Sequence, residues 1–297
     1  MFLIANAETY GAIQIFKNIL PLMGLSLFVA GLATDAALIY KAAVNRGWMR
    51  KGGEKLRRKP WTPRISVEII LWIILAWSIV GVLTPESANQ AVDPDNIDGL
   101  SFVLHTLVLP VVLLGMTAWK IKSIGVTWQQ SFGFRNQGFL SCLKKSVAAY
   151  LAAIPPASVA GYIILHWLNT LGYEIELQQT VRYLSRPGNQ MWFNMYMAFL
   201  AIILAPVAEE ILFRGIILPS VLKHCRTWLG VIFVSLLFAA IHGQAHFAAP
   251  LFVMGMAFAL SYIATGSLVT PIIVHSLFNL VTVLNVLIRH DLPEIGL

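Results

Sequence analysis

Long runs of apolar residues recur along the whole chain, and they constrain its fold more than any other feature. Hydrophobic residues make up 58% of the 297 residues and charged residues only 12%, whereas a soluble domain has about 25% charged residues. A membrane-spanning helix needs about 20 apolar residues. The sequence therefore predicts an all-α, polytopic membrane bundle of about eight transmembrane helices. The predicted segments, good to a few residues, are 18–41, 65–83, 100–119, 146–169, 191–217, 228–243, 250–265 and 268–288.

The loops between these segments differ in charge. Nine Lys and Arg residues lie in the stretch from Lys41 to Arg64, with both ends counted. The loops 120–145 and 218–227 are basic as well, while the alternate loop 84–99 is acidic. Basic loops face the cytoplasm in most membrane proteins. We therefore expect an integral, multi-pass protein with both termini extracytoplasmic, in the plasma membrane if the source is prokaryotic.

Several classes of protein are disfavoured by the same sequence. The net charge of +7 comes from loops with no aromatic–basic module, so the expected partner is the lipid bilayer and not nucleic acid. Cys142 and Cys225 lie too far apart for a CxxC or zinc-finger motif, which excludes a disulfide framework. The first apolar run lacks a basic start and is expected to be retained as a helix. No internal repeat supports an inverted-repeat transporter.

Charged residues inside apolar segments are costly and so point to function. The fifth segment contains Glu209, Glu210 and Arg214. The spacing of Glu210 and Arg214 is i,i+4, which places them on one helix face and predicts an ion pair. Glu209 then points about 100° away and has no local partner, which makes it a candidate general base or acid. The alternative is that all three residues form one structural network.

Two later segments place more polar side chains on single helix faces. Phe238 and His242 are spaced i,i+4 in the sixth segment, and His275 and Asn279 are spaced i,i+4 in the eighth. Measured from the cytoplasmic ends at a rise of about 1.5 Å per residue, the two histidines and Glu209 lie roughly 11–21 Å deep. These depths permit one common site inside the bilayer. His246 is expected in or near the loop that follows the sixth segment.

Three motifs, Glu-Glu-x-x-x-Arg, Phe-x-x-x-His and His-x-x-x-Asn, occur in this order within about 70 residues. The pattern, over roughly residues 195–285, resembles the CPBP family, which includes the type II CAAX prenyl endopeptidases and the Abi group of bacteriocin-processing or immunity proteins. The resemblance divides one continuous membrane domain into N-terminal transmembrane helices of unassigned role (1–190) and a CPBP-like catalytic core (191–288).

The resemblance implies an intramembrane endopeptidase of the glutamate type, which hydrolyses a peptide bond of a protein or peptide substrate that can carry a lipid, as in CAAX-type processing. Glu209 and His242 would activate water, Glu210 and Arg214 would orient the site, His275 and Asn279 would stabilise the oxyanion, and Phe238 would support the site. No cofactor is favoured. Zinc is the alternative, with Glu209, His242 and His275 as ligands, but no HExxH pair preorganises two of them.

Two other functions use the same residues without peptide hydrolysis. A proton- or ion-coupled transporter would explain the intramembrane acids and histidines, but it leaves the amide of Asn279 without a role. A non-enzymatic membrane scaffold or immunity protein would keep the fold without turnover. Replacing Glu209 separates these functions, because a scaffold should keep its phenotype and a protease should lose it.

Overall fold

The computed structural model describes residues 2–83, 99–173 and 191–290, and every regular element in these ranges is a helix. The all-α class is therefore confirmed. The predicted acidic loop and most of the loop at 170–190 lie outside the described residues. The helices are α1 (Phe2–Val44), α2 (Trp48–Arg57), α3 (Pro63–Leu83), α5 (Gly99–Ser123), α6 (Trp128–Phe132), α7 (Phe139–Thr170), α9 (Met191–Phe199), η1 (Leu200–Leu204), α10 (Ala205–Glu210), η2 (Ile211–Ile217), α11 (Leu218–Leu222), α12 (Thr227–Ile241), α13 (Ala245–Thr265) and α14 (Val269–His290).

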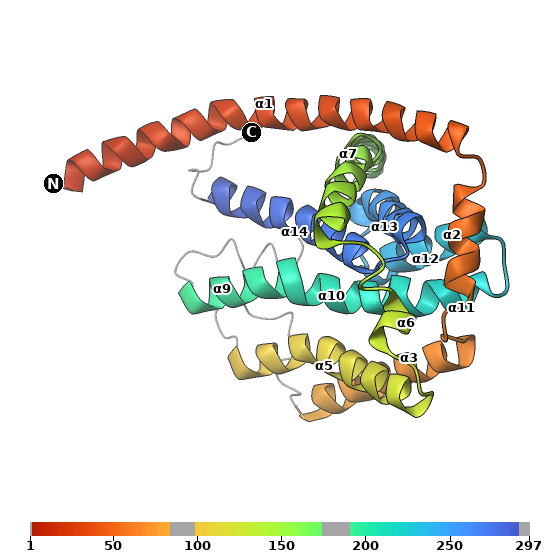
Figure 1. The fold of residues 1–297 in the computed structure, drawn as a ribbon. Coiled ribbons are helices and arrows are strands. Elements are labelled where there is room, and N and C mark those ends of the chain that lie inside the picture. The colour runs from red at the N-terminus through yellow and green to blue at the C-terminus, as the bar shows by residue number, and fades with distance from the viewer. Residues whose placement is uncertain (1, 84–98, 174–190, 291–297) are drawn as a thin grey trace.

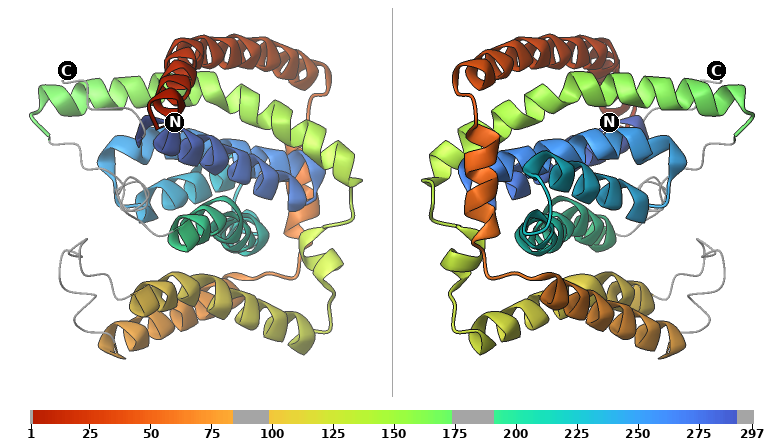
Figure 2. Two further views of the ribbon diagram at one scale, coloured as in Figure 1. Left: turned by 90° about the vertical axis from the view of Figure 1, so that its left-hand side faces the viewer. Right: turned by 90° about the vertical axis from the view of Figure 1, so that its right-hand side faces the viewer.

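The long helices stack in layers, as Figures 1 and 2 show. Helix α1 crosses over α7, and α7 packs against α13 and α14. Next comes the continuous run from α9 to α11, which contacts α14 through η1 and α10. The hairpin of α3 and α5 covers the other side of this run. The run from α9 to α11 is therefore enclosed between two layers of helices.

Six segments of these helices are long and apolar enough to cross a membrane. They are Leu22–Val44, Pro63–Leu83, His105–Ser123, Phe139–Thr170, Met191–Leu222 and Ala245–Thr265. Two further apolar helices, Thr227–Ile241 and Val269–Asn285, are shorter, and together the eight correspond to the predicted segments. The 15 residues of α12 extend only about 22 Å, less than the ~30 Å hydrocarbon core. A helix of this length that begins at one membrane surface ends inside the bilayer.

The basic loop after α1 contains a helix that the sequence pattern did not predict. Helix α2 runs across the direction of the long helices at one end of the bundle (Figure 1). Gly52 lies against Ile263 and Gly53 against Thr227, so closely that a Cβ atom at either position would collide. Leu56 is buried on the same face. The two glycines thus let α2 dock on α12 and α13, although glycine disfavours an isolated helix.

Candidate active site

The helix that carries the two glutamates is interrupted by two π-helical segments. The π-helical segments η1 and η2 precede and follow α10, which is only six residues long. Such segments are rare and occur often at functional sites. A π-helical turn contains one residue more than an α-helical turn, and one extra residue rotates the side chains that follow by about 100°. The segment η1 therefore changes the direction in which Glu209 and Glu210 point relative to α9.

A proline lies two residues beyond the end of each π-helical segment, and the first of them explains one hydrogen bond of the site. In η1 the N–H of Ala205 donates to Leu200 O, five residues back. The same register would pair Ala201 O with residue 206, which is a proline and has no N–H. Asn279 Nδ2 instead donates to Ala201 O over 2.7 Å. Asn279, from α14, thus satisfies a carbonyl group that Pro206 leaves without a helical partner.

The predicted ion pair between Glu210 and Arg214 is present in the protein interior. Arg214 Nη1 lies 2.7 Å from Glu210 Oε1, and both side chains are fully buried. Arg214 Nη2 also donates to Gly255 O, which ties η2 to α13. The guanidinium carbon lies 4.4 Å from the ring centre of Phe238 and 4.9 Å from that of Phe258, so aromatic faces surround the buried cation.

His275 connects the two glutamates. Its Nδ1 lies 3.0 Å from Glu210 Oε1, and its Nε2 lies 3.9 Å from Glu209 Oε2. Because a carboxylate paired with arginine only accepts hydrogen bonds, His275 Nδ1 carries the proton in this contact. The arrangement, a buried carboxylate that orients an imidazole through Nδ1, is the one that also orients the histidine of catalytic triads.

His242 lies just beyond the last residue of α12, and its ring orientation is defined by the backbone. Its Nδ1 lies 2.7 Å from Phe238 O, and since a carbonyl oxygen only accepts, Nδ1 is the donor. The neutral ring therefore has its lone pair on Nε2, which faces Glu209 Oε2 at 4.0 Å. The short length of α12 explains how a residue at its end meets Glu209 within the bilayer.

Glu209 differs from Glu210 in its surroundings. Its side chain is 17% exposed, against 0% for Glu210. Its Oε2 atom is buried and makes no hydrogen bond with the described residues, which is also true of Glu210 Oε2, but only Glu209 Oε2 faces the Nε2 atoms of both histidines, at 4.0 Å and 3.9 Å. A separation near 4 Å is too long for a direct hydrogen bond and suits a bridging water. Glu209 is thus the more exposed of the two glutamates and the one that faces both histidine Nε2 atoms.

The ring of Phe238 packs against both histidines of the site. Its ring is fully buried and contacts the rings of His242 and His275, with centres 4.6 Å and 5.7 Å apart. Phe258, which the motifs did not identify, stacks on His275 at 4.6 Å. Single phenylalanines in an apolar helix give no sequence signal for such a role. His246, expected near the loop, lies buried in the first turn of α13.

The same residues can be tested as a zinc site. The chemistry of Glu209, His242 and His275 fits, because both histidines are oriented through Nδ1 and each would present an Nε2 lone pair when its ring is neutral. Their spacing does not fit. Tetrahedral ligands about 2.0–2.1 Å from zinc lie roughly 3.4 Å from one another, but Glu209 Oε2 lies 4.0 Å and 3.9 Å from the two nitrogens. Within the described part of the chain, no three His, Cys, Asp or Glu residues are placed to hold a metal ion.

Fold and site together define the class of the protein, a polytopic helical membrane protein with an acidic, histidine-containing site among its last helices. Residues 191–281 match the family model described as type II CAAX prenyl endopeptidase Rce1-like. The match includes all seven predicted site residues, from Glu209 to Asn279, and confirms the CPBP assignment for this segment. A match to a protease family supports an enzyme that cleaves peptide bonds.

One curated relative is an uncharacterised 24.3 kDa protein of Escherichia coli. It is 42% identical over 78 residues, which make up 25% of this chain and 36% of that protein. The chain thus matches about a third of the length of this relative. No solved structure matches the chain.

Proposed function

We propose that the chain is an intramembrane endopeptidase in which Glu209 activates water for attack on a peptide bond. The observation that carries the proposal is the convergence of three polar atoms, since Glu209 Oε2 faces the Nε2 atoms of His242 and His275 at 4.0 Å and 3.9 Å. A structural network would pair these groups directly, whereas these separations are too long for a direct hydrogen bond and suit one bridging water.

The protonation states follow from the neighbours of each ring. A water between Glu209 and His242 donates one hydrogen to the carboxylate and one to His242 Nε2, so that an oxygen lone pair faces outward. As this oxygen attacks the substrate carbonyl, Glu209 accepts a proton, and it returns this proton to the leaving amine. General acid–base catalysis of this kind contributes about 10²–10⁴-fold in rate.

His275 is the residue that we assign to the developing oxyanion. Protonated on Nε2, its ring is an imidazolium that donates towards the tetrahedral intermediate, while Glu210 holds the Nδ1 proton. One such donor contributes on the order of 3 kcal/mol. Asn279, expected beside it as a second donor, uses one N–H for Ala201 O and retains its other N–H for this purpose.

We favour a metal-free site, because the carboxylate and imidazole groups supply the base, the proton donor and the oxyanion donor at spacings that suit water better than zinc. Zinc remains the second candidate, since its three ligands would be the same residues. Measurement of bound metal together with activity separates the two.

We further propose that the basic end of the bundle faces the cytoplasm, that both termini are extracytoplasmic and that the site opens to the cytoplasmic side. The proposed substrate is a protein or peptide segment in or at the membrane. The name of the matched family indicates a prenylated protein as one substrate class, so that CAAX-type processing or a related maturation is the proposed reaction.

The test is peptide cleavage by the purified protein in lipid nanodiscs, with products identified by mass spectrometry. Glu209→Gln preserves the size of the side chain and should abolish cleavage. Glu68→Gln is the matched control, because Glu68 pairs with Lys120 at 2.6 Å and has no part in the proposed chemistry. Equal cleavage by wild type and Glu209→Gln would refute the proposal and favour the scaffold or transporter.

A further inference from the structure

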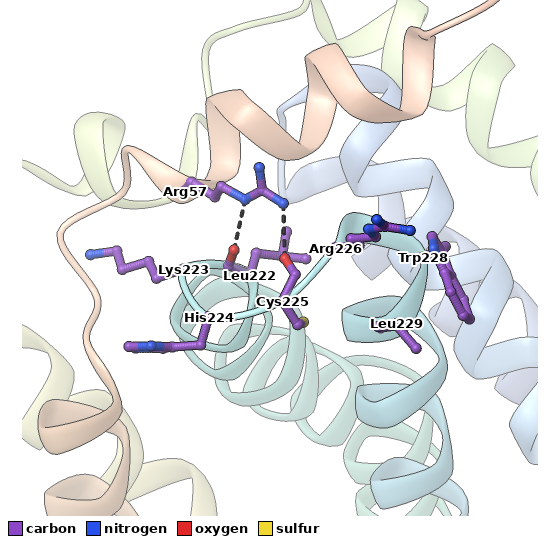
Figure 3. Close-up of a pocket in the computed structure, with 8 residues that line it drawn as sticks. All are labelled: Arg57, Leu222, Lys223, His224, Cys225, Arg226, Trp228 and Leu229. Atoms are coloured by element: carbon purple, nitrogen blue, oxygen red, sulfur yellow. Dashed lines mark hydrogen bonds between the residues drawn. The ribbon is translucent and has the colours of Figure 1, made fainter.

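A second polar site lies at the basic end of the bundle, apart from the residues of the candidate active site. The turn between α11 and α12 and the end of α2 line a shallow pocket of about 620 Å³ (Figure 3). Its polar lining consists largely of cationic side chains, and its apolar lining includes Leu222 at the end of α11 and two residues from the start of α12. The cationic and apolar side chains of this lining include Arg57, Lys223, His224, Arg226, Trp228 and Leu229.

Arg57 fixes the shape of this pocket. Its Nε donates to Leu222 O over 2.7 Å and its Nη2 donates to Cys225 O over 2.8 Å, as the dashed lines in Figure 3 show. Both carbonyl groups belong to the end of α11 and the turn after it, where a cation is favourable. Arg57 thus joins α2 to the turn that carries the neighbouring cationic residues.

Lys223 and Arg226 extend from this turn and are exposed. Neither makes an ion pair with an acidic side chain in the part of the chain that the structure describes. The acid on α2, Glu54, is 3.9 Å from Arg50 of its own helix. The positive charge of the pocket is therefore left for an anion from outside the protein.

An apolar stripe on the outer face of α12 begins at the pocket. Leu229, Phe233 and Leu236, spaced i, i+4 and i+7, are 42%, 54% and 53% exposed. Trp228, 49% exposed, lies beside the cationic residues, where tryptophan is typical of the membrane–water interface. A cationic pocket that continues into an exposed apolar stripe is complementary to an anionic phospholipid. The pocket matches the charged headgroup, and the stripe matches the acyl chain.

We propose that this pocket binds the phosphate group of an anionic phospholipid, whose acyl chain lies along Leu229, Phe233 and Leu236. Free phosphate would use the cations but gain nothing from the stripe, and a zwitterionic lipid would leave the net positive charge without compensation. The lipid would connect α2 with α12 through its headgroup. The site does not depend on the proposed peptidase activity.

The experiment measures lipid binding to the purified, detergent-solubilised protein by native mass spectrometry. Phosphatidylglycerol and phosphatidylcholine with the same acyl chains are titrated against wild type, Lys223→Gln/Arg226→Gln and the control Lys122→Gln/Lys144→Gln. The control removes the same charge from exposed residues at the same end of the bundle. We expect preferential binding of phosphatidylglycerol, weakened about tenfold or more in the pocket variant and little changed in the control.

Cys225 provides a second measurement inside the pocket. Cys142 is fully buried, so alkylation by N-ethylmaleimide reports on Cys225, with Cys225→Ser as the blank. Phosphatidylglycerol should slow alkylation of the wild type more than phosphatidylcholine or inorganic phosphate does. The proposal is overturned if the two lipids bind equally, if both double variants lose binding alike, or if inorganic phosphate alone protects Cys225 as well as the lipid does.

Discussion

The buried pair of Glu210 and Arg214 allows the most quantitative prediction. Both side chains are fully buried, and the contact of 2.7 Å is reinforced by the bond from Arg214 to Gly255 O. Removal of one partner of a buried ion pair costs about 3–5 kcal/mol, because the other charge stays buried without compensation. We therefore expect Arg214→Met, which keeps much of the side-chain volume, to destabilise the protein by about this amount.

The double variant Glu210→Gln/Arg214→Met should recover a large part of this loss. It removes both charges, and the amide oxygen of the introduced glutamine can still accept a hydrogen bond from His275 Nδ1. Removing a whole buried pair is often close to neutral, so we expect the double variant to be roughly 2 kcal/mol or more stable than Arg214→Met. It should remain inactive, because the carboxylate of Glu210 no longer holds the Nδ1 proton of His275.

Thermal unfolding in detergent, followed by tryptophan fluorescence, measures both effects. At roughly 2–4 °C per kcal/mol for a chain somewhat shorter than this one, Arg214→Met should lower Tm by about 10 °C, and the double variant should regain several degrees. If the double variant is no more stable than Arg214→Met, the charge pairing is not what stabilises this region. The packing of Arg214 against the phenylalanine rings would then be the dominant contribution.

Three further predictions concern helix docking, the π-helical segment and orientation. Gly52→Ala should lower Tm, because overpacking costs about 1–3 kcal/mol. The control is Gly24→Ala, which should leave Tm unchanged because nothing lies within 4 Å of the new Cβ. Equal Tm values for the two variants would contradict the docking of α2. Asn279→Ala should cost about 1–3 kcal/mol for the partly buried carbonyl of Ala201 that it leaves unpaired, and it should lower kcat. Asn285→Ala, whose amide bonds within its own helix, should do neither. An unchanged kcat in Asn279→Ala would argue against its role as an oxyanion donor. An impermeant maleimide should label Cys225 from the cytoplasmic face, and labelling from the outer face alone would reverse the proposed orientation.

The sequence predicted the membrane helices well, because a span of the bilayer requires a long apolar run wherever it occurs. Helix α2 was missed for the opposite reason. Its sequence contains few apolar residues and a Gly52–Gly53 pair, which disfavours a helix in isolation. The helix depends on close contacts with Ile263 and Thr227, two residues more than 170 positions away along the chain, so no local pattern indicates it.

The site was partly predictable for similar reasons. Spacing of i,i+4 correctly predicted the contact between Glu210 and Arg214, because it depends on one helix only. The depths of Glu209 and the two histidines in the bilayer permitted their meeting, but depth does not determine which faces of three separate helices turn towards one another. The π-helical segments beside α10 were not predicted, and the local signals in hindsight are Pro206 and Pro219, each just beyond one of these segments. The bond from Asn279 to Ala201 O comes from another helix, so no local pattern indicates it.

Cleavage by the metal-depleted protein is the most direct test of the central claim, that Glu209 activates water without a metal ion. Wild type, Glu209→Gln and His242→Ala are purified with a strong chelator, their metal content is determined, and peptide cleavage is followed with and without added zinc. Our account predicts that metal-depleted wild type cleaves the peptide, that zinc does not increase the rate and that both variants are inactive. Cleavage that disappears with the metal and returns in proportion to bound zinc would contradict it and make the same three residues zinc ligands.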